Sequence, residues 1–204
     1  MNEVTVLGAG LAGSECAWQL AKRGIKGRLY EMKPAKMTPA HTSEYFAELV
    51  CSNSLRGDRL ENAVGLLKEE LRRCGSLIME CAEATRVEAG GCLAVDRAGF
   101  SRMVTEKIKA NPLIHVVSEE VTRIPQEPVI IATGPLTSDA LSESIGQYFG
   151  ADYLHFFDAA APLVTAESVD MNLAWWQSRY DRGTPDYINC AMNREQYEAF
   201  IREV

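Results

Sequence analysis

The sequence predicts an α/β domain built around a mainly parallel sheet. Short apolar runs without polar alternation, at residues 4–7 and 129–132, are typical of strands buried on both faces. Each run passes directly or almost directly into a glycine, at Gly8 and Gly134. Residues with helical spacing follow the first run, and another strand-like segment comes next. A strand, a helix and a further strand in this order indicate a βαβ unit.

The first three elements are predicted from residues 1–31. Residues 4–7 form a buried strand, and apolar residues then recur at helical spacing over 11–21. Lys22-Arg23-Gly24 supplies the cations and the glycine that are common where a helix ends. Residues 28–31 form the second strand.

A long segment without a clear pattern, residues 32–59, follows the second strand and contains two prolines. It is longer than an ordinary connection in a compact domain, and such loops usually carry function. The next helix presents Val64, Leu67 and Leu71 on one face, and Gly75 ends it.

The remaining elements are predicted from a cap, from apolar runs and from helical spacing. Asp96 is the predicted N-cap of a helix that Pro112 ends. Trp175 and Trp176 interrupt the pattern near the end of the chain. We expect strands at residues 114–117, 121–124, 129–132, 153–157 and 163–165, and helices at 138–147 and 194–203.

We predict two domains, with a boundary near Gly150. Residues 1–150 form an incomplete dinucleotide-binding domain, and residues 151–204 begin an inserted α/β domain for the substrate. The chain ends inside its last predicted helix without a stop signal, which we interpret as a truncation.

The composition is that of an ordinary globular protein, with 47% hydrophobic and 24% charged residues. No apolar stretch is long enough to span a bilayer and the first residues lack a signal pattern, so we expect a cytoplasmic protein with no membrane partner. Six cysteines without Cys-x-x-Cys spacing and only three histidines predict reduced thiols and no metal site. The sequence indicates no particular oligomeric state.

The charge is distributed unevenly along the chain. The formal net charge of −7 argues against nucleic-acid binding through the overall field. Residues 1–73 carry 11 Lys and Arg against 9 Asp and Glu, a net +2, whereas residues 74–204 carry 10 against 19, a net −9. A polyanion would therefore prefer the first third of the chain, residues 1–73.

A G-x-G-x-x-G motif opens the first predicted helix, and its context after a strand is typical of dinucleotide-binding folds. Gly8 permits a tight turn, Gly10 lets the backbone approach a pyrophosphate, and Gly13 lets the helix pack closely on the strand. The predicted cofactor-binding residues of this loop are Gly8, Ala9, Gly10, Leu11, Ala12 and Gly13.

Two further features extend the predicted cofactor site. Glu31, at the end of the second strand, is placed to accept both ribose hydroxyl hydrogens of the adenosine half. Thr133 and Gly134 follow the apolar run at 129–131 and resemble the second glycine-containing strand end of flavoprotein folds, which favours FAD over NAD. A strand followed by a glycine turn without any ligand is an equally good interpretation.

The loop after Glu31 carries a more specific resemblance. Residues 30–34 (Tyr-Glu-Met-Lys-Pro), 38–41 (Thr-Pro-Ala-His) and 48–56 (Glu-Leu-Val-Cys-Ser-Asn-Ser-Leu-Arg) resemble the folate-dependent, FAD-containing tRNA uracil-5 methyltransferases. The resemblance extends over essentially all 204 residues, including three further segments. These are Asp96-Arg97, residues 157–162 (Phe-Asp-Ala-Ala-Ala-Pro) and residues 187–190 (Tyr-Ile-Asn-Cys).

The resemblance implies a Rossmann-like FAD-binding domain and a specific reaction. A flavin would accept a one-carbon unit from methylenetetrahydrofolate and deliver it to C5 of a uridine in the tRNA T-loop, with NAD(P)H as reductant. Members of this family are about twice as long as this chain. The implied missing half leads us to expect poor FAD binding and no complete methyl transfer by this chain alone.

The resemblance also assigns a functional thiol near the flavin to Cys51, whereas an isolated cysteine is more often a buried small hydrophobe. His41 and Arg56 lie in the same loop as candidates for a neighbouring acid or base. In the family, the cysteine that attacks uracil C6 belongs to the part missing from this chain. We therefore expect Cys190, which lies in a different motif, to be structural.

Local basic patches would have to offset the negative charge in tRNA binding, and the candidates are Lys33, Lys36, Arg56 and Arg59. Three other functions stay open. The first is a related FAD-dependent protein that modifies the tRNA wobble uridine, although the Cys51 loop points away from it. The others are a non-catalytic nucleotide-binding module and, ranked last, an NAD-dependent dehydrogenase, for which no His/Asp catalytic pair is evident.

Overall fold

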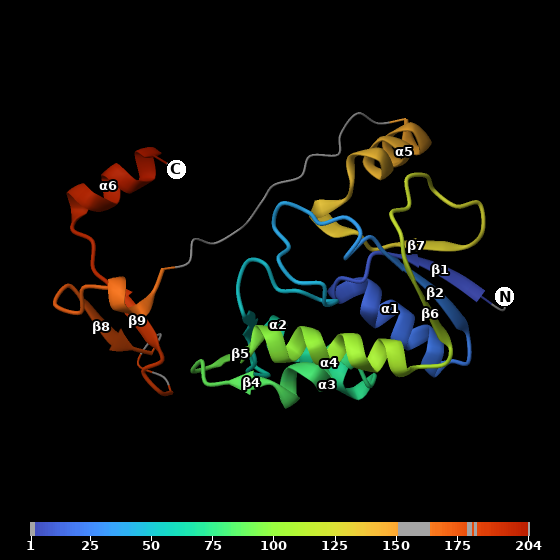
Figure 1. Ribbon diagram of the computed structural model, residues 1–204. Helices are drawn as coiled ribbons and strands as arrows, with labels where there is room; N and C mark the ends of the chain where they lie inside the picture. The colour runs from blue at the N-terminus through green and yellow to red at the C-terminus, as the bar shows by residue number, and fades with distance from the viewer. Residues whose placement is uncertain (1–2, 151–163, 179–180, 182, 204) are drawn as a thin grey trace.

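The computed structural model describes residues 3–150, 164–178, 181 and 183–203. Its main sheet has four strands in the order β6-β2-β1-β7, and every neighbouring pair is parallel (Figure 1). The predicted α/β class with a mainly parallel sheet is therefore confirmed. The strands are β1 (Glu3–Leu7), β2 (Lys26–Glu31), β6 (Ile114–Ser118) and β7 (Val129–Ile131).

Helices cover the main sheet and bury its apolar side chains. In Figure 1, α1, α3 and α4 lie below the sheet and α5 lies above it. Val6 and Leu29 of the sheet share one core with Ala17 of α1 and with Phe100 and Val104 of α4. All five are at most 1% exposed. The helices are α1 (Leu11–Lys22), α3 (Leu77–Ala84), α4 (Arg97–Ala110) and α5 (Asp139–Phe149).

The predicted helix ends are observed. The Asp96 carboxylate accepts the Gly99 N–H at 3.1 Å and caps α4, as expected for an N-cap aspartate. Gly24 follows α1 and Gly75 follows α2 (Ala63–Arg73), with φ of +73° and +65°, a left-handed conformation that glycine adopts without strain.

A second sheet was not predicted. Its strands, β3 (Ser54–Gly57), β5 (Cys92–Val95) and β4 (Arg86–Val87), pair antiparallel. The expectation of a patternless segment over residues 32–59 is thus wrong at its end, where β3 begins. Helix α3 was also missed. These elements have two to eight residues, too few to show a clear period.

Helix α2 (Ala63–Arg73) forms where predicted, but a different face is buried. Gly65 and Lys68 face the protein, while Leu67 and Leu71 are 55% and 37% exposed. A Cβ on Gly65 would lie 1.9 Å from the Arg59 carbonyl oxygen. Close packing at this glycine sets the rotation of the helix, so its leucines point outward.

Residues 121–124 are not a strand, contrary to the prediction. The Ile124 N–H donates to the Ser144 hydroxyl of α5 at 3.2 Å instead of joining a ladder. Pro125 follows Ile124, and the connection continues to Val129, where β7 begins.

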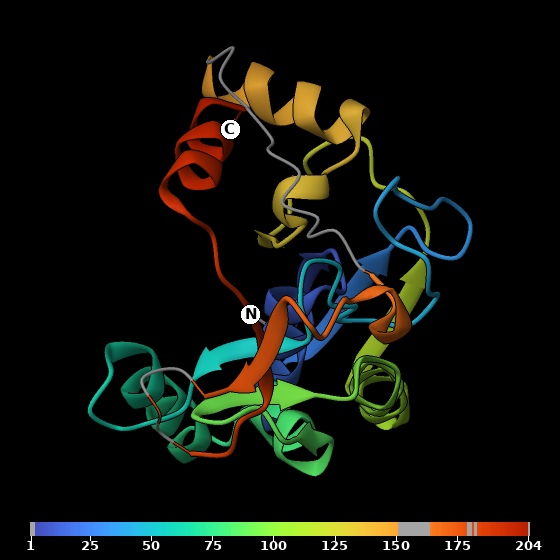
Figure 2. The same cartoon turned by 90° about the vertical axis from the view of Figure 1, so that its left-hand side faces the viewer.

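The C-terminal part consists of β8 (Ala174–Gln177) and β9 (Tyr187–Cys190), which pair antiparallel, and α6 (Arg194–Glu203). Trp175 and Trp176 belong to β8 and do not interrupt it, because aromatic residues suit strands. The hairpin lies beside the second sheet (Figures 1 and 2), where the Tyr187 hydroxyl donates to the Ala89 carbonyl at 3.0 Å.

The other two strands predicted in this part have different outcomes. The one at residues 153–157 lies outside the described residues. At 163–165, the two residues that are described form no strand and precede a short 3-10 helix, Ala166–Ser168. In the described part of the chain, no helix is long and apolar enough to cross a membrane.

Candidate cofactor site

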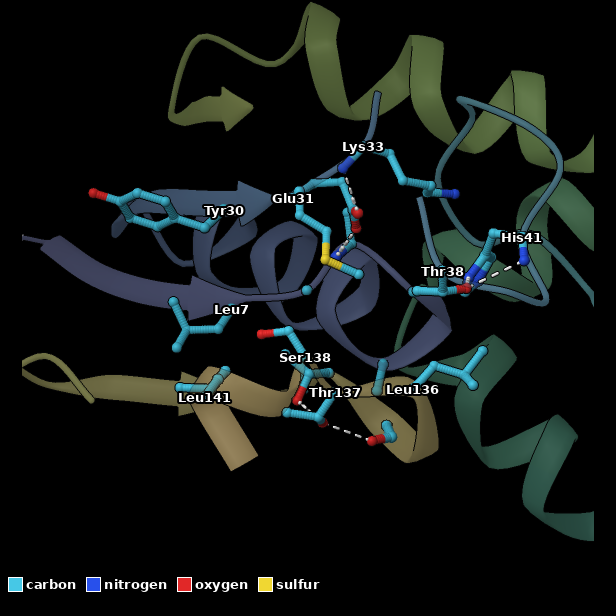
Figure 3. A pocket seen from close by; sticks show the side chains of 18 of the residues that line it. Leu7, Tyr30, Glu31, Lys33, Thr38, His41, Leu136, Thr137, Ser138 and Leu141 are labelled. Carbon is cyan, nitrogen blue, oxygen red and sulfur yellow. Dashed lines mark hydrogen bonds between the residues drawn. The ribbon is translucent and has the colours of Figure 1, made fainter. Parts of the chain in front are cut away.

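A cavity of about 330 Å³ opens at the carboxyl ends of all four parallel strands (Figure 3). Ligands of open α/β sheets bind at this edge, where the strand order reverses. Here the order reverses at β1, whose neighbours are β2 and β7. Most predicted cofactor residues line the cavity, namely Gly8, Ala9, Gly10, Leu11, Ala12, Glu31, Thr133 and Gly134.

The three motif glycines have three different surroundings. Gly8 has a φ of +90°, and a Cβ there would lie 2.9 Å from the Ala132 carbonyl oxygen. A Cβ on Gly13 would lie 1.7 Å from the Gly8 carbonyl oxygen, so Gly13 supports packing and does not line the cavity. A Cβ on Gly10 would meet nothing within 4 Å. Only at Gly10 does the missing side chain leave open space.

The first turn of α1 provides an anion site at this open space. Gly10 is the N-cap, and no side chain among the described residues caps the helix there. The first N–H groups of a helix lack intrahelical acceptors and carry partial positive charge. A diphosphate over Gly10 would receive these hydrogen bonds.

Glu31 is 8% exposed, and both of its carboxylate oxygens accept backbone hydrogens. The Ala9 N–H donates to one oxygen at 2.9 Å and the Lys33 N–H to the other at 3.0 Å (Figure 3). Glu31 therefore fixes the glycine loop, residues 8–13, to the end of β2. Each oxygen retains a lone pair for a ribose hydroxyl, so ribose binding stays a prediction.

The segment between β2 and β3 folds back onto the glycine loop. The Ala47 N–H donates to the Ala9 carbonyl at 2.9 Å, and Ala47 adopts a left-handed φ of +51°. The neighbouring Phe46 is 2% exposed, and its N–H donates to the Thr105 hydroxyl of α4 at 2.8 Å. No sequence pattern indicates this contact, because Ala47 is an ordinary residue in an unusual conformation.

Lys33 is 4% exposed and is no part of a surface patch, contrary to the expectation that it binds tRNA. Its ammonium donates to the Ser43 and Tyr45 carbonyls at 3.1 and 2.6 Å and lies 3.6 Å from the Glu48 carboxylate. A buried charge is stable only when it is paired in this way. Lys33 therefore organises the loop from inside.

Glu48 is the acidic partner in this network. Burial alone would raise its pKa, but the hydrogen bonds from Thr42 and Ser43 and the nearby Lys33 charge lower the pKa below its ordinary value. The Thr42 N–H and hydroxyl donate at 3.0 Å, and the Ser43 N–H donates at 3.2 Å. Glu48 is ionised at neutral pH.

His41 is half-buried and lines the cavity. Its Nδ1 lies 2.6 Å from the Thr38 hydroxyl, which also accepts the His41 N–H at 3.2 Å (Figure 3). Burial lowers the pKa of His41 and the Lys33 charge lowers it further, while the Glu48 and Glu31 carboxylates oppose the shift. The ring is therefore neutral at neutral pH.

Cys51, the predicted functional thiol, is exposed and does not line the cavity, although its neighbour Val50 does. Arg56 is exposed and lies in β3. The structure therefore places Cys51 at the margin of the cavity and does not bring Arg56 into it. Sequence reasoning missed the roles of Thr38, Lys33 and Glu48 in this loop.

Thr133 and Gly134 line the opposite wall, after β7. The Thr133 and Thr137 hydroxyls share a hydrogen bond of 2.6 Å, and Gly134 begins a 3-10 helix (Gly134–Leu136). No group of three or more His, Cys, Asp or Glu residues suited to a metal ion occurs in the described part of the chain. The described lining of the cavity offers backbone donors, hydroxyls, carboxylates, the His41 imidazole and the Lys33 ammonium.

Comparison with known proteins identifies the family. Residues 3–204 match the family "Glucose inhibited division protein A". The chain is 63% identical over 205 residues to "Methylenetetrahydrofolate--tRNA-(uracil-5-)-methyltransferase TrmFO" of Acetivibrio thermocellus, covering 100% of this chain and 47% of the relative. Its identity to the protein of the same name from Lactobacillus helveticus is 61% over 204 residues, covering 100% and 50%.

The chain spans about half the length of the curated relatives it matches. Among solved structures, Aquifex aeolicus GidA gives a TM-score of 0.49 at 18% identity, covering 61% of this chain and 20% of that chain. The assignment rests on the family match, which extends over nearly all 204 residues. The chain belongs to the glucose inhibited division protein A family.

Proposed function

We propose that this chain forms the FAD-binding part of a folate-dependent tRNA uracil-5-methyltransferase. The observation that carries the proposal is the cavity over Gly10, where the α1 N-terminus and the absence of a side chain leave space for a diphosphate. The identity of 63% to a relative named for this activity supports the same reaction.

The residues of the cavity fit a dinucleotide in a definite order. The glycine loop receives the diphosphate at Gly10, and Glu31 accepts hydrogen bonds from the ribose of the adenosine half. The second half then extends toward Val50 and Leu136, which line the cavity. FAD bound there would supply the redox chemistry for moving a one-carbon unit from methylenetetrahydrofolate to C5 of a T-loop uridine, with NAD(P)H as reductant.

We propose that Cys51 acts near the flavin part of the bound cofactor. Its support is its position directly after Val50, on a loop that Lys33 and Glu48 fix against the glycine loop. An exposed thiol beside the cavity is accessible to a substrate, whereas a buried one is not.

The tRNA would contact exposed cations near this thiol. Arg56 and Arg59 are exposed, whereas Lys36 is paired with Glu120 at 2.8 Å. We therefore propose Arg56 and Arg59 as the tRNA contacts of this part of the protein. We place the domain division at residues 1–150 and 151–204, and propose that this chain alone does not complete methyl transfer, since it spans half of its relatives.

The other functions rank lower. The related wobble-uridine modification shares the dinucleotide unit, but the relatives at 61–63% identity are named for uracil-5 methylation. A non-catalytic nucleotide-binding module would use the same cavity without Cys51. An NAD-dependent dehydrogenase would require a His/Asp catalytic pair, and the described lining of the cavity contains His41 but no Asp.

A visible absorption spectrum tests the proposal. The purified chain is mixed with FAD, freed of excess by gel filtration, and compared with Gly10→Val. We expect weak binding, because the chain spans about half of its relatives, but the wild type should retain detectable flavin bands. The valine side chain enters open space, and Gly10 has a φ of −69° that any residue adopts, so the variant should fold but lose the flavin.

Two results would contradict this proposal. Absence of retained flavin in the folded wild type would exclude FAD binding by this chain. Equal retention by Gly10→Val would place the flavin elsewhere. Thermal unfolding of both proteins, followed by far-UV circular dichroism, checks that the variant is folded.

A further inference from the structure

The cavity contains few side-chain groups that suit an anion. Four carboxylates line it, those of Glu31, Glu48, Glu119 and Glu120. Side-chain nitrogens come only from Lys33 and His41 in the described lining. A dinucleotide carries a doubly charged diphosphate, which these carboxylates repel. Besides the N-terminus of α1 and the hydroxyls of the described lining, these two nitrogens are the side-chain donors that could favour the diphosphate.

Lys33 is already saturated. Its ammonium has three hydrogens, of which two bond the Ser43 and Tyr45 carbonyls and the third faces Glu48. Turning this group toward a ligand would leave the Glu48 charge unpaired in a partly buried site. Of the two side chains, His41 is therefore the one whose nitrogen remains available to the diphosphate.

The Thr38 hydroxyl fixes which His41 nitrogen is available. Its oxygen accepts the His41 backbone N–H at 3.2 Å and lies 2.6 Å from Nδ1. When this hydroxyl donates its proton to Nδ1, the proton of the neutral ring is on Nε2. Nδ1 is engaged by Thr38, and Nε2–H is left as a neutral donor in a cavity-lining side chain.

We propose that His41 binds the diphosphate of the dinucleotide in this cavity by donating Nε2–H to a phosphate oxygen. The inference rests on the proposed function for the identity of that dinucleotide. Thr38 is then a positioning residue, because it acts by holding the imidazole and its tautomer. The donor set for the diphosphate combines the α1 backbone with one side chain from the loop that packs on it.

Proton uptake follows from this arrangement. The groups that face His41 are Lys33 and Glu48 from its own loop and Glu31 from β2. A bound diphosphate adds negative charge beside the ring and raises the pKa of His41, which in the free protein lies below its ordinary value. FAD affinity should therefore increase as the pH falls from about 8 to about 6.

The test measures the dissociation constant of FAD by flavin fluorescence at several pH values. His41→Leu should raise the constant about tenfold and abolish its pH dependence, because one hydrogen bond to a charged group is lost. His41→Gln should stay within about threefold of the wild type, since its amide N–H replaces Nε2–H, but without the pH dependence. Thr38→Val should weaken binding by about threefold through loss of the fixed tautomer.

Competition with smaller ligands separates phosphate from ribose contacts. His41→Leu should weaken the binding of ADP but leave that of adenosine unchanged. Equal weakening of both would overturn the phosphate contact. Unchanged FAD affinity and pH dependence in His41→Leu would overturn the inference while the proposed function stands, whereas a wild type that binds neither FAD nor ADP overturns both. Thermal unfolding confirms that each variant is folded.

Discussion

The two loops that pack against each other beside the cavity are ordered by different means. The glycine loop, residues 8–13, is set by steric limits between backbone atoms, as the positions of Gly8 and Gly13 show. The loop over residues 32–53 contains no regular element, and side-chain charges and hydroxyls around Lys33 and Glu48 set its path.

The difference shows where each loop is vulnerable. A steric limit fails when a single carbon is added, because atoms in a packed interior cannot move aside. A polar network fails when one partner is removed, because the other is left buried and unpaired. Each mechanism therefore predicts its own most damaging substitution.

Gly13→Ala should have the largest effect. The new Cβ would lie 1.7 Å from the Gly8 carbonyl oxygen, so α1 must separate from the turn after β1. We expect a loss of more than about 3 kcal/mol in the free energy of unfolding. Gly10→Ala is the matched control, since its Cβ meets nothing within 4 Å and should leave the melting temperature unchanged. Similar melting temperatures for the two variants would contradict the steric account.

Lys33→Met should have the next largest effect, because it keeps the length of the side chain and removes its charge. Glu48 remains, with 13% of its side chain exposed and with its bonds from Thr42 and Ser43 intact. Partial exposure reduces the cost, which we expect to be about 2 kcal/mol in urea unfolding. Adding Glu48→Gln to Lys33→Met should restore part of the lost free energy of unfolding. If the changes in the free energy of unfolding from the two substitutions are strictly additive, the two side chains are not coupled.

The fold around the glycine loop was predictable because its signals are local. The runs at residues 4–7 and 129–131, the cap at Asp96 and the stop at Gly24 each act within a few residues. The second sheet was not predictable. Its strands have two to four residues, and its pairing joins Ser54 to Ala94 across forty residues of chain.

The candidate site likewise has one part that the sequence predicts and one part that it does not. The glycine motif and Glu31 were found because fixed spacing expresses a backbone requirement. The roles of Thr38, His41 and Lys33 depend on which carbonyls and hydroxyls meet after folding, and no spacing rule encodes this. Lys33 shows the problem, since the sequence presents it as one more basic residue and the structure buries it.

The pH dependence of stability tests the network without removing its cation. The folded-state pKa of Glu48 lies below its ordinary value of 4.5, so its stabilising contribution is present above that value and is lost as the pH falls through the folded-state pKa. Glu48→Gln should cost about 1.5 kcal/mol at pH 7, because hydrogen bonds to a charged acceptor are lost.

The difference between wild type and Glu48→Gln should then shrink as the pH decreases from about 5 to about 3. Urea unfolding at several pH values gives both free energies. A constant difference across that range would mean that the charge of Glu48 contributes nothing and that only its shape matters.

The ion pair between Lys36 and Glu120 should have the smallest effect. It joins the loop to the segment after β6 at 2.8 Å, but 52% of the Lys36 side chain and 24% of that of Glu120 are exposed. Water and salt screen such a pair, so Lys36→Met should cost no more than about 0.5 kcal/mol and nothing at about 1 M salt. A loss comparable to that in Lys33→Met would mean that the loop is held at its rim as well as at its interior, and the contrast between the two loops would then have to include surface charge.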